Sequence, residues 1–199
     1  MTQEIRELID RIMADAPPPL TGPYVLYAGK LAPNKGVQFL IPALQRAGIT
    51  WPIAIAGDGP SRDAVARDAA ASGLDVRLLG WIDRDDTLRW MRHATMLAFP
   101  SYGPESLSRV LIESAAMGVP IAAMDTGGTR DIITPGVTGL LSSTPDAFAQ
   151  DLARLAGDET LRTRLGAAAG RHAREHFAAP SVSARVEALY RSIMDERPA

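Results

Sequence analysis

The chain has 199 residues, 46% of them hydrophobic, with a formal net charge of -2, which suits one globular domain or two small ones. It contains no cysteine, which excludes disulfides, thiolate metal sites and a cysteine nucleophile, and no long basic run that would favour nucleic-acid binding. No segment approaches the ~18 apolar residues of a membrane span, and the N-terminus is too polar for a signal peptide, so we expect a cytoplasmic protein without a transmembrane segment.

Residues 1–19 are predicted to form an N-terminal helix followed by a proline-rich break. Apolar residues between positions 3 and 15 recur with the spacing of one helical face: Ile5, Leu8, Ile9, Ile12 and Met13. The prolines at 17, 18 and 19 then end the helix, because proline lacks the N–H group that a helix needs.

Residues 20–199 alternate between short apolar runs and helical patterns. The expected strands are 24–29, 53–57, 75–80, 95–100, 119–124 and 138–142. The expected helices are 36–47, 61–72, 85–93, 106–118, 128–133, 145–156, 158–177 and 181–195. This alternation predicts an α/β domain with a doubly wound, parallel, six-stranded, Rossmann-like sheet and C-terminal helices. Such sheets bind ligands at the carboxyl ends of their strands, so the loops there should carry the function.

The loop after the first strand, AGKLAPNKG, contains the only two lysines of the chain, Lys30 and Lys35. Gly36 then opens a helix, and a helix N-terminus with free N–H groups is a natural anion site. Two compact ammonium groups in one such loop suit a diphosphate. A solvated loop with two idle lysines is the alternative reading.

The loop after the second strand, GDGPS, has Gly57 and Gly59, which permit close approach of another backbone. Pro60 suits the first turn of the following helix. Arg62 stands where a dinucleotide fingerprint has its third glycine, so an NAD site is only weakly indicated and a tight structural turn is the simpler explanation.

The loop after the third strand, LLGWIDRDD, brings three acids close together: Asp83, Asp85 and Asp86. Because they immediately precede a helix, capping of its N-terminus is favoured over metal binding. Trp81 after Gly80 could flank a nucleobase or cover the end of the sheet.

The loop after the fourth strand carries two acids eight residues apart, Glu105 and Glu113. A helix from 106 would place Glu105 at its N-terminus and Glu113 about two turns in. Glu113 has apolar neighbours, and a buried carboxylate is costly without a partner, so a sugar diol is a candidate partner. An exposed acid on the polar helix face is the alternative.

The loop after the fifth strand, DTGGTRD, offers another possible anion or hydroxyl nest at Thr126, Gly127 and Gly128. His172 and His176 form an H-x-x-E-H pattern, which we interpret as a helix surface rather than a zinc site. His93, near a helix end, is expected to be structural. No metal site is therefore expected.

Taken together, these loops resemble the C-terminal, donor-binding domain of GT-B glycosyltransferases, in particular glycosyltransferase family 4 (glycosyl transferases group 1). The resemblance covers about residues 23–142. It is carried by six motifs in order: GKLAPNKG for G-[RK]-x4-K-G, GDGP for G-x-G-P, LLG at a strand end, ESLSRVLIE for E-x7-E, the pair Gly127–Gly128, and GVTGLL. Each motif is weak alone, but six at the expected strand ends are specific.

The resemblance implies a role for each matched residue. Lys30 and Lys35 would hold the donor diphosphate, Glu105 would lie against the donor sugar near the reacting carbon, and Glu113 would bind the ribose hydroxyls. The implied catalytic residues are Glu105, Lys35 and Lys30. The implied donor-binding residues are Lys30, Lys35, Gly57, Gly59, Gly80, Trp81, Ile82, Glu105, Leu107, Ser108, Arg109 and Glu113.

Within this set, Gly80 to Ile82 would border the base, and the backbone amides of Leu107 to Arg109 would meet phosphate or sugar. The chain departs from the family pattern at three places: Lys30 replaces the more common arginine, Ser108 replaces glycine, and Arg130-Asp131 replaces Pro-Glu.

The implied reaction is retaining transfer of a hexose-type sugar from a nucleotide-diphosphate sugar to an acceptor hydroxyl, without a cofactor or a bound metal. The family's N-terminal acceptor-binding domain is absent from these 199 residues, so the expected partners are a nucleotide-sugar and such a domain or separate subunit. The isolated domain is expected to be inactive. Two alternatives remain: a non-catalytic nucleotide-sugar-binding module or subunit, and half of a nucleotide-sugar 2-epimerase-like isomerase. The ESLSRVLIE segment favours the transferase.

Overall fold

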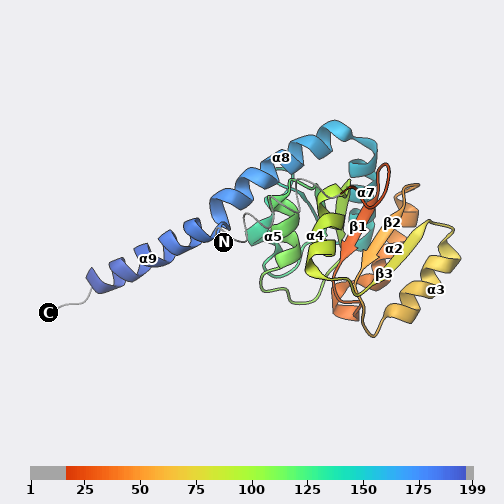
Figure 1. Cartoon of the computed structure of the whole chain (residues 1–199), viewed down its shortest axis with the longest axis horizontal. Helices are drawn as coiled ribbons and strands as arrows, with labels where there is room; N and C mark the ends of the chain where they lie inside the picture. Colours follow the sequence, from red (N-terminus) through yellow and green to blue (C-terminus); the bar gives the residue numbers. More distant parts are fainter. Residues whose placement is uncertain (1–16, 196–199) are drawn as a thin grey trace.

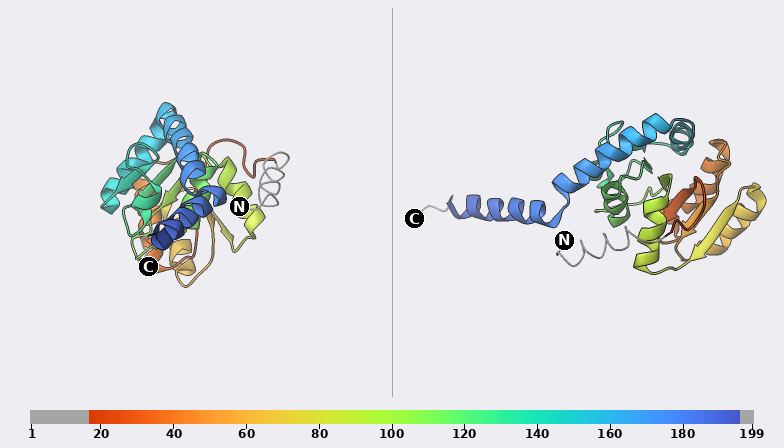
Figure 2. Two further views of the ribbon diagram at one scale, coloured as in Figure 1. Left: turned by 90° about the vertical axis from the view of Figure 1, so that its left-hand side faces the viewer. Right: turned by 45° about the horizontal axis from the view of Figure 1, so that its top comes forward.

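The computed structural model describes residues 17–195, so the helix expected between residues 3 and 15 lies outside the described residues. Figure 1 shows a body built around a sheet, with the last helix projecting from it, and the second view in Figure 2 shows the same projection. The strands are β1 (Val25–Ala28), β2 (Ile53–Ala56), β3 (Val76–Gly80), β4 (Met96–Phe99), β5 (Ile121–Met124) and β6 (Leu140–Ser142).

The helices follow the strands in the expected alternation. They are the 3-10 helix η1 (Pro33–Lys35), α2 (Val37–Arg46), α3 (Arg62–Ser72), α4 (Arg84–His93), α5 (Arg109–Ala116), α6 (Thr129–Ile132), α7 (Pro145–Gly157), α8 (Glu159–His176) and α9 (Ala179–Asp195). Within residues 17–195, none of the helices is both long and apolar enough to cross a membrane.

The sheet is parallel throughout and its six strands have the order β3-β2-β1-β4-β5-β6. This order reverses between β1 and β4, because successive connections run outward from β1 in one direction and from β4 in the other. The predicted doubly wound, Rossmann-like fold is therefore confirmed. In such a sheet, the crevice at the reversal point is the expected ligand site.

Helices cover both faces of the sheet, which is why its central strands are apolar along their whole length. Alternate side chains of β1 enter different cores. Val25 and Tyr27 pack with residues of α2, α3 and α7, whereas Leu26 packs with residues of α4, α5 and α8. The central strands are thereby held rigidly by both layers, and the loops at their carboxyl ends start from fixed positions.

One helix boundary differs from the sequence prediction in a way that affects function. The helix expected from residue 106 begins at Arg109, so Glu105 belongs to the preceding loop. Glu113 therefore lies about one turn into α5 rather than two. The loop from Tyr102 to Leu107 does not follow the helical path because its backbone is held by other partners, described below.

Candidate functional site

A cavity of about 760 Å³ lies at the carboxyl ends of β1 and β2, and residues that follow β3 and β4 also line it. All but two of the predicted binding residues line it: Lys30, Lys35, Gly57, Trp81, Ile82, Glu105, Leu107, Ser108, Arg109 and Glu113. The remaining two, Gly59 and Gly80, do not belong to its lining. The structure thus brings together residues that are up to 83 positions apart in sequence, from Lys30 to Glu113, at the point where the strand order reverses.

The glycines of the first two loops act through close packing of backbones. A Cβ atom at Gly57 would lie 1.9 Å from the carbonyl oxygen of Gly29, and one at Gly59 would lie 2.4 Å from that of Leu31. Gly36, with a φ of 67°, would meet the carbonyl oxygen of Pro100 at 1.8 Å. These contacts hold the β1 loop against the loops that follow β2 and β4. Gly59 therefore supports the site from outside the cavity wall.

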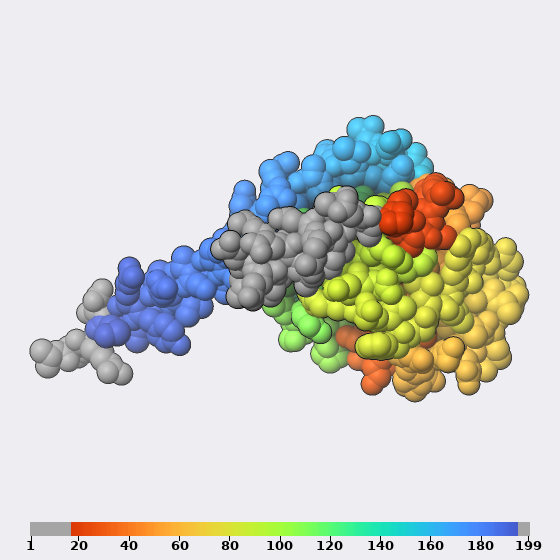
Figure 3. Space-filling model, viewed as in Figure 1, coloured from red at the N-terminus to blue at the C-terminus, as the bar shows by residue number. Residues whose placement is uncertain are grey.

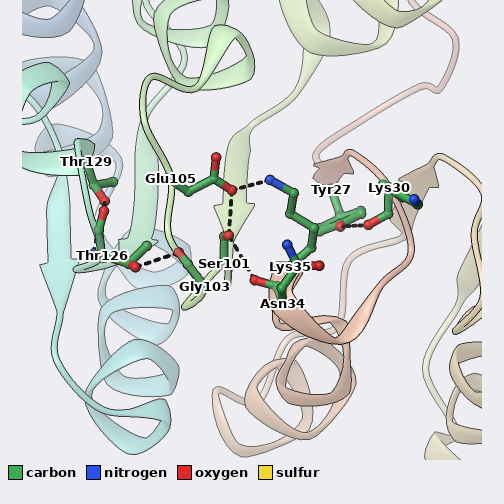
Figure 4. Close-up of polar contacts among 9 residues, drawn as sticks. All are labelled: Tyr27, Lys30, Asn34, Lys35, Ser101, Gly103, Glu105, Thr126 and Thr129. Carbon is green, nitrogen blue, oxygen red and sulfur yellow. Dashed lines mark hydrogen bonds and ion pairs between the residues drawn. The ribbon is translucent and has the colours of Figure 1, made fainter.

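Lys35 lies in an ion pair that the sequence did not reveal. Its Nζ contacts Oε1 of Glu105, and the hydroxyl of Ser101 lies 2.7 Å from the same oxygen (Figure 4). The Ser101 hydroxyl also lies 3.3 Å from the backbone oxygen of Asn34, but its single proton serves one acceptor at a time. The Glu105 side chain is only 11% exposed, and the ammonium group of Lys35 balances its charge.

Gly127 and Gly128 pack against the backbone of Glu105. The N–H of Gly128 donates a 2.8 Å hydrogen bond to the backbone oxygen of Glu105, and a Cβ atom at Gly127 would lie 2.2 Å from that oxygen. The hydroxyl of Thr126 donates to the backbone oxygen of Gly103 at 2.8 Å (Figure 4). These residues do not line the cavity, and the Gly128 N–H and the Thr126 hydroxyl bind the loop that carries Glu105, so the anion nest here stays a prediction.

Lys30 is exposed at the cavity, and its ammonium group has no partner among residues 17–195. Its backbone oxygen accepts a 2.9 Å hydrogen bond from the hydroxyl of Tyr27. Burial and the nearby charge of Glu105 raise the pKa of Tyr27 above its usual value, so the hydroxyl remains a donor. The hydrogen bond from Tyr27 fixes the backbone at the start of the loop and does not involve the Lys30 side chain.

Glu113 is paired with a residue that the sequence analysis missed. Nη2 of Arg84 lies 2.9 Å from Oε1 of Glu113, whose side chain is 21% exposed. Arg84 is the first residue of α4 and also lines the cavity. Glu113 is therefore not the exposed, unpaired acid of the alternative reading. The sequence does show an arginine, Arg84, directly after the capping residue Asp83. Its pairing with Glu113 could not be predicted, because it depends on how α4 packs beside α5.

The loop after β3 combines a cap with an exposed aromatic ring. Oδ1 of Asp83 accepts a 2.8 Å hydrogen bond from the N–H of Asp86, so the predicted capping role is confirmed. Trp81 lines the cavity and is 78% exposed, so it does not cover the sheet end in this structure. Gly80 adopts a left-handed φ of 68° and its carbonyl oxygen accepts from the N–H of Gly57 at 2.8 Å.

The H-x-x-E-H pattern lies on α8 and does not line the cavity. The rings of His172 and His176 have centroids 4.4 Å apart, and His172 also contacts Phe177 edge-on. The described part of the chain contains no cluster of three or more side chains suited to a metal ion.

A family model described as glycosyl transferases group 1 matches residues 22–158 of the chain. The chain belongs to this family. Among relatives of this group 1 protein, a D-inositol 3-phosphate glycosyltransferase of Xylanimonas cellulosilytica is 30% identical over 189 residues, covering 91% of the chain and 45% of the relative. An alpha-D-kanosaminyltransferase of Streptomyces kanamyceticus is 30% identical, covering 86% of the chain and 46% of the relative. The group 1 chain thus spans about half the length of these curated relatives.

Solved structures show the same fold. Anabaena HepE in complex with UDP superposes with a TM-score of 0.77 at 22% identity, over 96% of this chain and 54% of that one. The C-terminal domain of LpcC, a glycosyl transferase group 1 family protein from Francisella tularensis, superposes with a TM-score of 0.71 at 20% identity, over 79% of this chain and 87% of that one. The group 1 chain therefore has the architecture of one half of a GT-B fold.

Proposed function

We propose that the chain is the C-terminal, donor-binding domain of a retaining glycosyltransferase of family 4. The complete enzyme would move a hexose-type sugar from a nucleotide-diphosphate sugar to an acceptor hydroxyl. The observation that carries this proposal is the cavity at the reversal point of the sheet, which gathers Lys30, Lys35, Glu105 and Glu113. Further support comes from relatives named as glycosyltransferases and from a similar fold bound to UDP.

We assign each part of the donor to particular residues of the cavity. Glu113, on α5 and beside Arg84, would accept hydrogen bonds from the ribose hydroxyls, with Trp81 and Ile82 bordering the base. Glu105 would face the donor sugar. The diphosphate would then lie between these carboxylates, close to Lys30 and Lys35. Fixed positive groups at that point would stabilise the charge that appears on the leaving diphosphate when the glycosyl bond breaks.

The Lys35–Glu105 ion pair adds a detail to this scheme. In the structure, Lys35 balances the charge of Glu105. An arriving diphosphate would compete for the ammonium group, and the carboxylate would become available to hydroxyl groups of the donor sugar. Binding of the phosphate groups and preparation of Glu105 would thereby be linked through a single side chain.

The acceptor would be held by a second domain or subunit. The length of the relatives and the C-terminal domain of LpcC support this part of the proposal. It predicts that this chain alone binds donor and transfers nothing, and that an added acceptor domain restores transfer. Failure of every such combination would favour a non-catalytic binding module, and conversion of the nucleotide-sugar alone to its 2-epimer would reveal an isomerase.

The proposal is tested by thermal unfolding with UDP, GDP, ADP and NAD, each with and without Mg²⁺. A ligand at 100 times its dissociation constant adds roughly 2.7 kcal/mol to the free energy of unfolding. We expect one nucleoside diphosphate to stabilise the chain without metal and NAD to have no effect. Stabilisation by NAD alone, or by none of the four, would contradict a preformed donor site.

A further inference from the structure

We propose that Ser101 is a positioning residue for Glu105. Its hydroxyl holds Oε1 of the Glu105 carboxylate when an arriving diphosphate draws Lys35 away, so that the other carboxylate oxygen keeps facing the donor sugar. This inference rests on the proposed function, in which Glu105 meets the sugar and Lys35 meets the diphosphate. Ser101 does not line the main cavity, so it acts through Glu105 and not by contact with the donor.

Lys35 and Ser101 contact the same carboxylate oxygen of Glu105 but differ in how far they can move. The Lys35 side chain is 30% exposed and carries its ammonium group on a flexible four-carbon stem, so it can turn toward a phosphate. Ser101 is only 1% exposed, and its hydroxyl is attached directly to Cβ, so it stays beside Glu105. A diphosphate therefore competes for one of the two partners and leaves the other in place.

The distances indicate that the Ser101 hydroxyl donates to Glu105. Its oxygen lies 2.7 Å from Oε1 of Glu105 and 3.3 Å from the backbone oxygen of Asn34. The shorter contact has the length of a charge-assisted hydrogen bond, and its acceptor is the charged one. No hydrogen bond to the second carboxylate oxygen occurs within residues 17–195, and this oxygen points away from both Ser101 and Lys35 (Figure 4). The bond to Oε1 thus leaves Oε2 available to a sugar hydroxyl.

Backbone contacts on both sides of Ser101 hold it in place. A Cβ atom at Gly36 would lie 1.8 Å from the carbonyl oxygen of Pro100, so these two backbones are in close contact. The N–H of Gly103 donates a 3.0 Å hydrogen bond to the backbone oxygen of Asn34. Ser101 therefore lies in a segment that is fixed at both ends against the turn that carries Lys35, and its hydroxyl starts from a defined position.

Glu105 needs such a partner because its side chain is only 11% exposed. A carboxylate with little access to water is costly unless it is hydrogen-bonded. When Lys35 turns to the diphosphate, Ser101 is the one remaining partner of this carboxylate among the described residues. Without the Ser101 hydroxyl, the carboxylate would lose its fixed orientation at the moment when the sugar has to be held.

The test measures the affinity of Ser101→Ala for two ligands by titration calorimetry. One is whichever of UDP, GDP and ADP stabilises the wild-type chain. The other is the nucleotide-sugar of the same base, carrying glucose, galactose, mannose or N-acetylglucosamine, that the wild type binds most tightly. Because a hydrogen bond to a charged acceptor is lost, we expect roughly tenfold weaker binding of the nucleotide-sugar and less than about a twofold change for the diphosphate.

A double-mutant cycle shows whether Ser101 acts through Glu105. In a Glu105→Gln background, Ser101→Ala should cause little further loss of nucleotide-sugar affinity, because the charged acceptor that it orients is already gone. A residue that merely supported the fold would reduce affinity by the same factor in both backgrounds.

Ser142→Ala is the matched control. The Ser142 hydroxyl is also buried and donates at 2.7 Å to Oδ2 of Asp151, whose Oδ1 is paired with Arg154 at 2.9 Å. This group has the same chemistry as the Ser101 site but does not line the cavity. Both serine variants should lose similar stability in thermal unfolding without ligand, whereas Ser142→Ala should bind both ligands as wild type does.

The outcomes separate this inference from the function on which it rests. If Ser101→Ala keeps wild-type affinity for the nucleotide-sugar, or loses affinity for both ligands equally, the inference is wrong and the donor site stands. The same conclusion follows if Ser101→Ala weakens binding by an equal factor in the Glu105→Gln background. If the wild type binds no diphosphate or no nucleotide-sugar, the proposed function and this inference fail together.

Discussion

The two lysines of the β1 loop have different surroundings. Lys30 is exposed and unengaged within residues 17–195, whereas Lys35 contacts Glu105. The sequence could place both in one loop, because each follows the same buried strand. It could not distinguish them, because the partner of Lys35 is 70 residues away and becomes a neighbour only through the pairing of β1 with β4.

Lys35→Ala should abolish measurable binding of the nucleoside diphosphate while leaving the fold intact. The change removes one positioned cation, and a hydrogen bond to a charged group contributes about 1.5–3 kcal/mol. Calorimetric titration and ligand-free thermal unfolding together measure the two effects. Lys30→Ala serves as the comparison, because removal of the Lys30 side chain does not leave a buried carboxylate without its partner. Wild-type affinity in Lys35→Ala would remove this lysine from the site.

Gly57→Ala should destabilise the whole domain, by about 3 kcal/mol, because the new methyl group would lie 1.9 Å from the carbonyl oxygen of Gly29. Gly73→Ala is the matched control. Gly73 has a left-handed φ of 71° and nothing within 4 Å of an added Cβ, so only the backbone strain of about 1–2 kcal/mol is expected. Urea unfolding of both variants measures the difference. Equal losses of unfolding free energy in the two variants would show that the loops at Gly29 and Gly57 can move apart without loss of stability.

At the scale of elements, helix α5 marks where sequence reasoning succeeded and where it failed. The pattern predicted a helix and a pair of acids, but the helix starts at Arg109 because the preceding loop is held by Gly127–Gly128 and Thr126. These contacts come from the loop after β5, which no periodicity within residues 100–120 can reveal. Most other boundaries shifted by only one or two residues, since apolar strands and capped helices are local features.

The pairing of α4 with α5 through Arg84 and Glu113 gives a test at this scale. Oε1 of Glu113 contacts Arg84, while no hydrogen bond to Oε2 occurs within the described residues, which leaves Oε2 open to a ribose hydroxyl. Glu113→Gln should weaken binding of the ribonucleoside diphosphate about tenfold, because a charged acceptor is lost. The 2′-deoxy ligand should lose less.

Titration of both ligands measures this difference, with Glu175→Gln on the exposed face of α8 as the control. Equal losses for the ribose and deoxyribose ligands would show that Glu113 acts through Arg84 or through folding, and not through the ribose.

At the scale of the whole molecule, the parallel sheet followed from the sequence and a cavity lies at its carboxyl edge as expected, but the course of the last helix was not predicted. Helix α9 projects beyond the body (Figures 1 and 3). Its large apolar side chains recur on the helix and are exposed: Val182, Val186, Leu189, Tyr190, Ile193 and Met194. A helical pattern predicts such a stripe but contains no information on whether this domain covers it.

Removal of residues 179–199 should leave the domain folded and able to bind the nucleoside diphosphate. Neither hydrophobic core includes a residue of α9, so the sheet and its two helical layers keep their packing. We expect the unfolding midpoint to change by less than about 4 °C, which corresponds to roughly 1 kcal/mol for a domain of this size. A truncated chain that is unfolded, or folded without ligand affinity, would show that α9 supports the body.

The residues that line the cavity all lie between Ala28 and Glu113 in the sequence. Of the described residues beyond this first part of the chain, Gly127 and Gly128 contact the cavity loops directly, through the backbone of Glu105 and Ser106. Substitutions in the first part therefore change the cavity wall itself, whereas those from β6 onward reach the cavity only through the packing of the sheet and its helices.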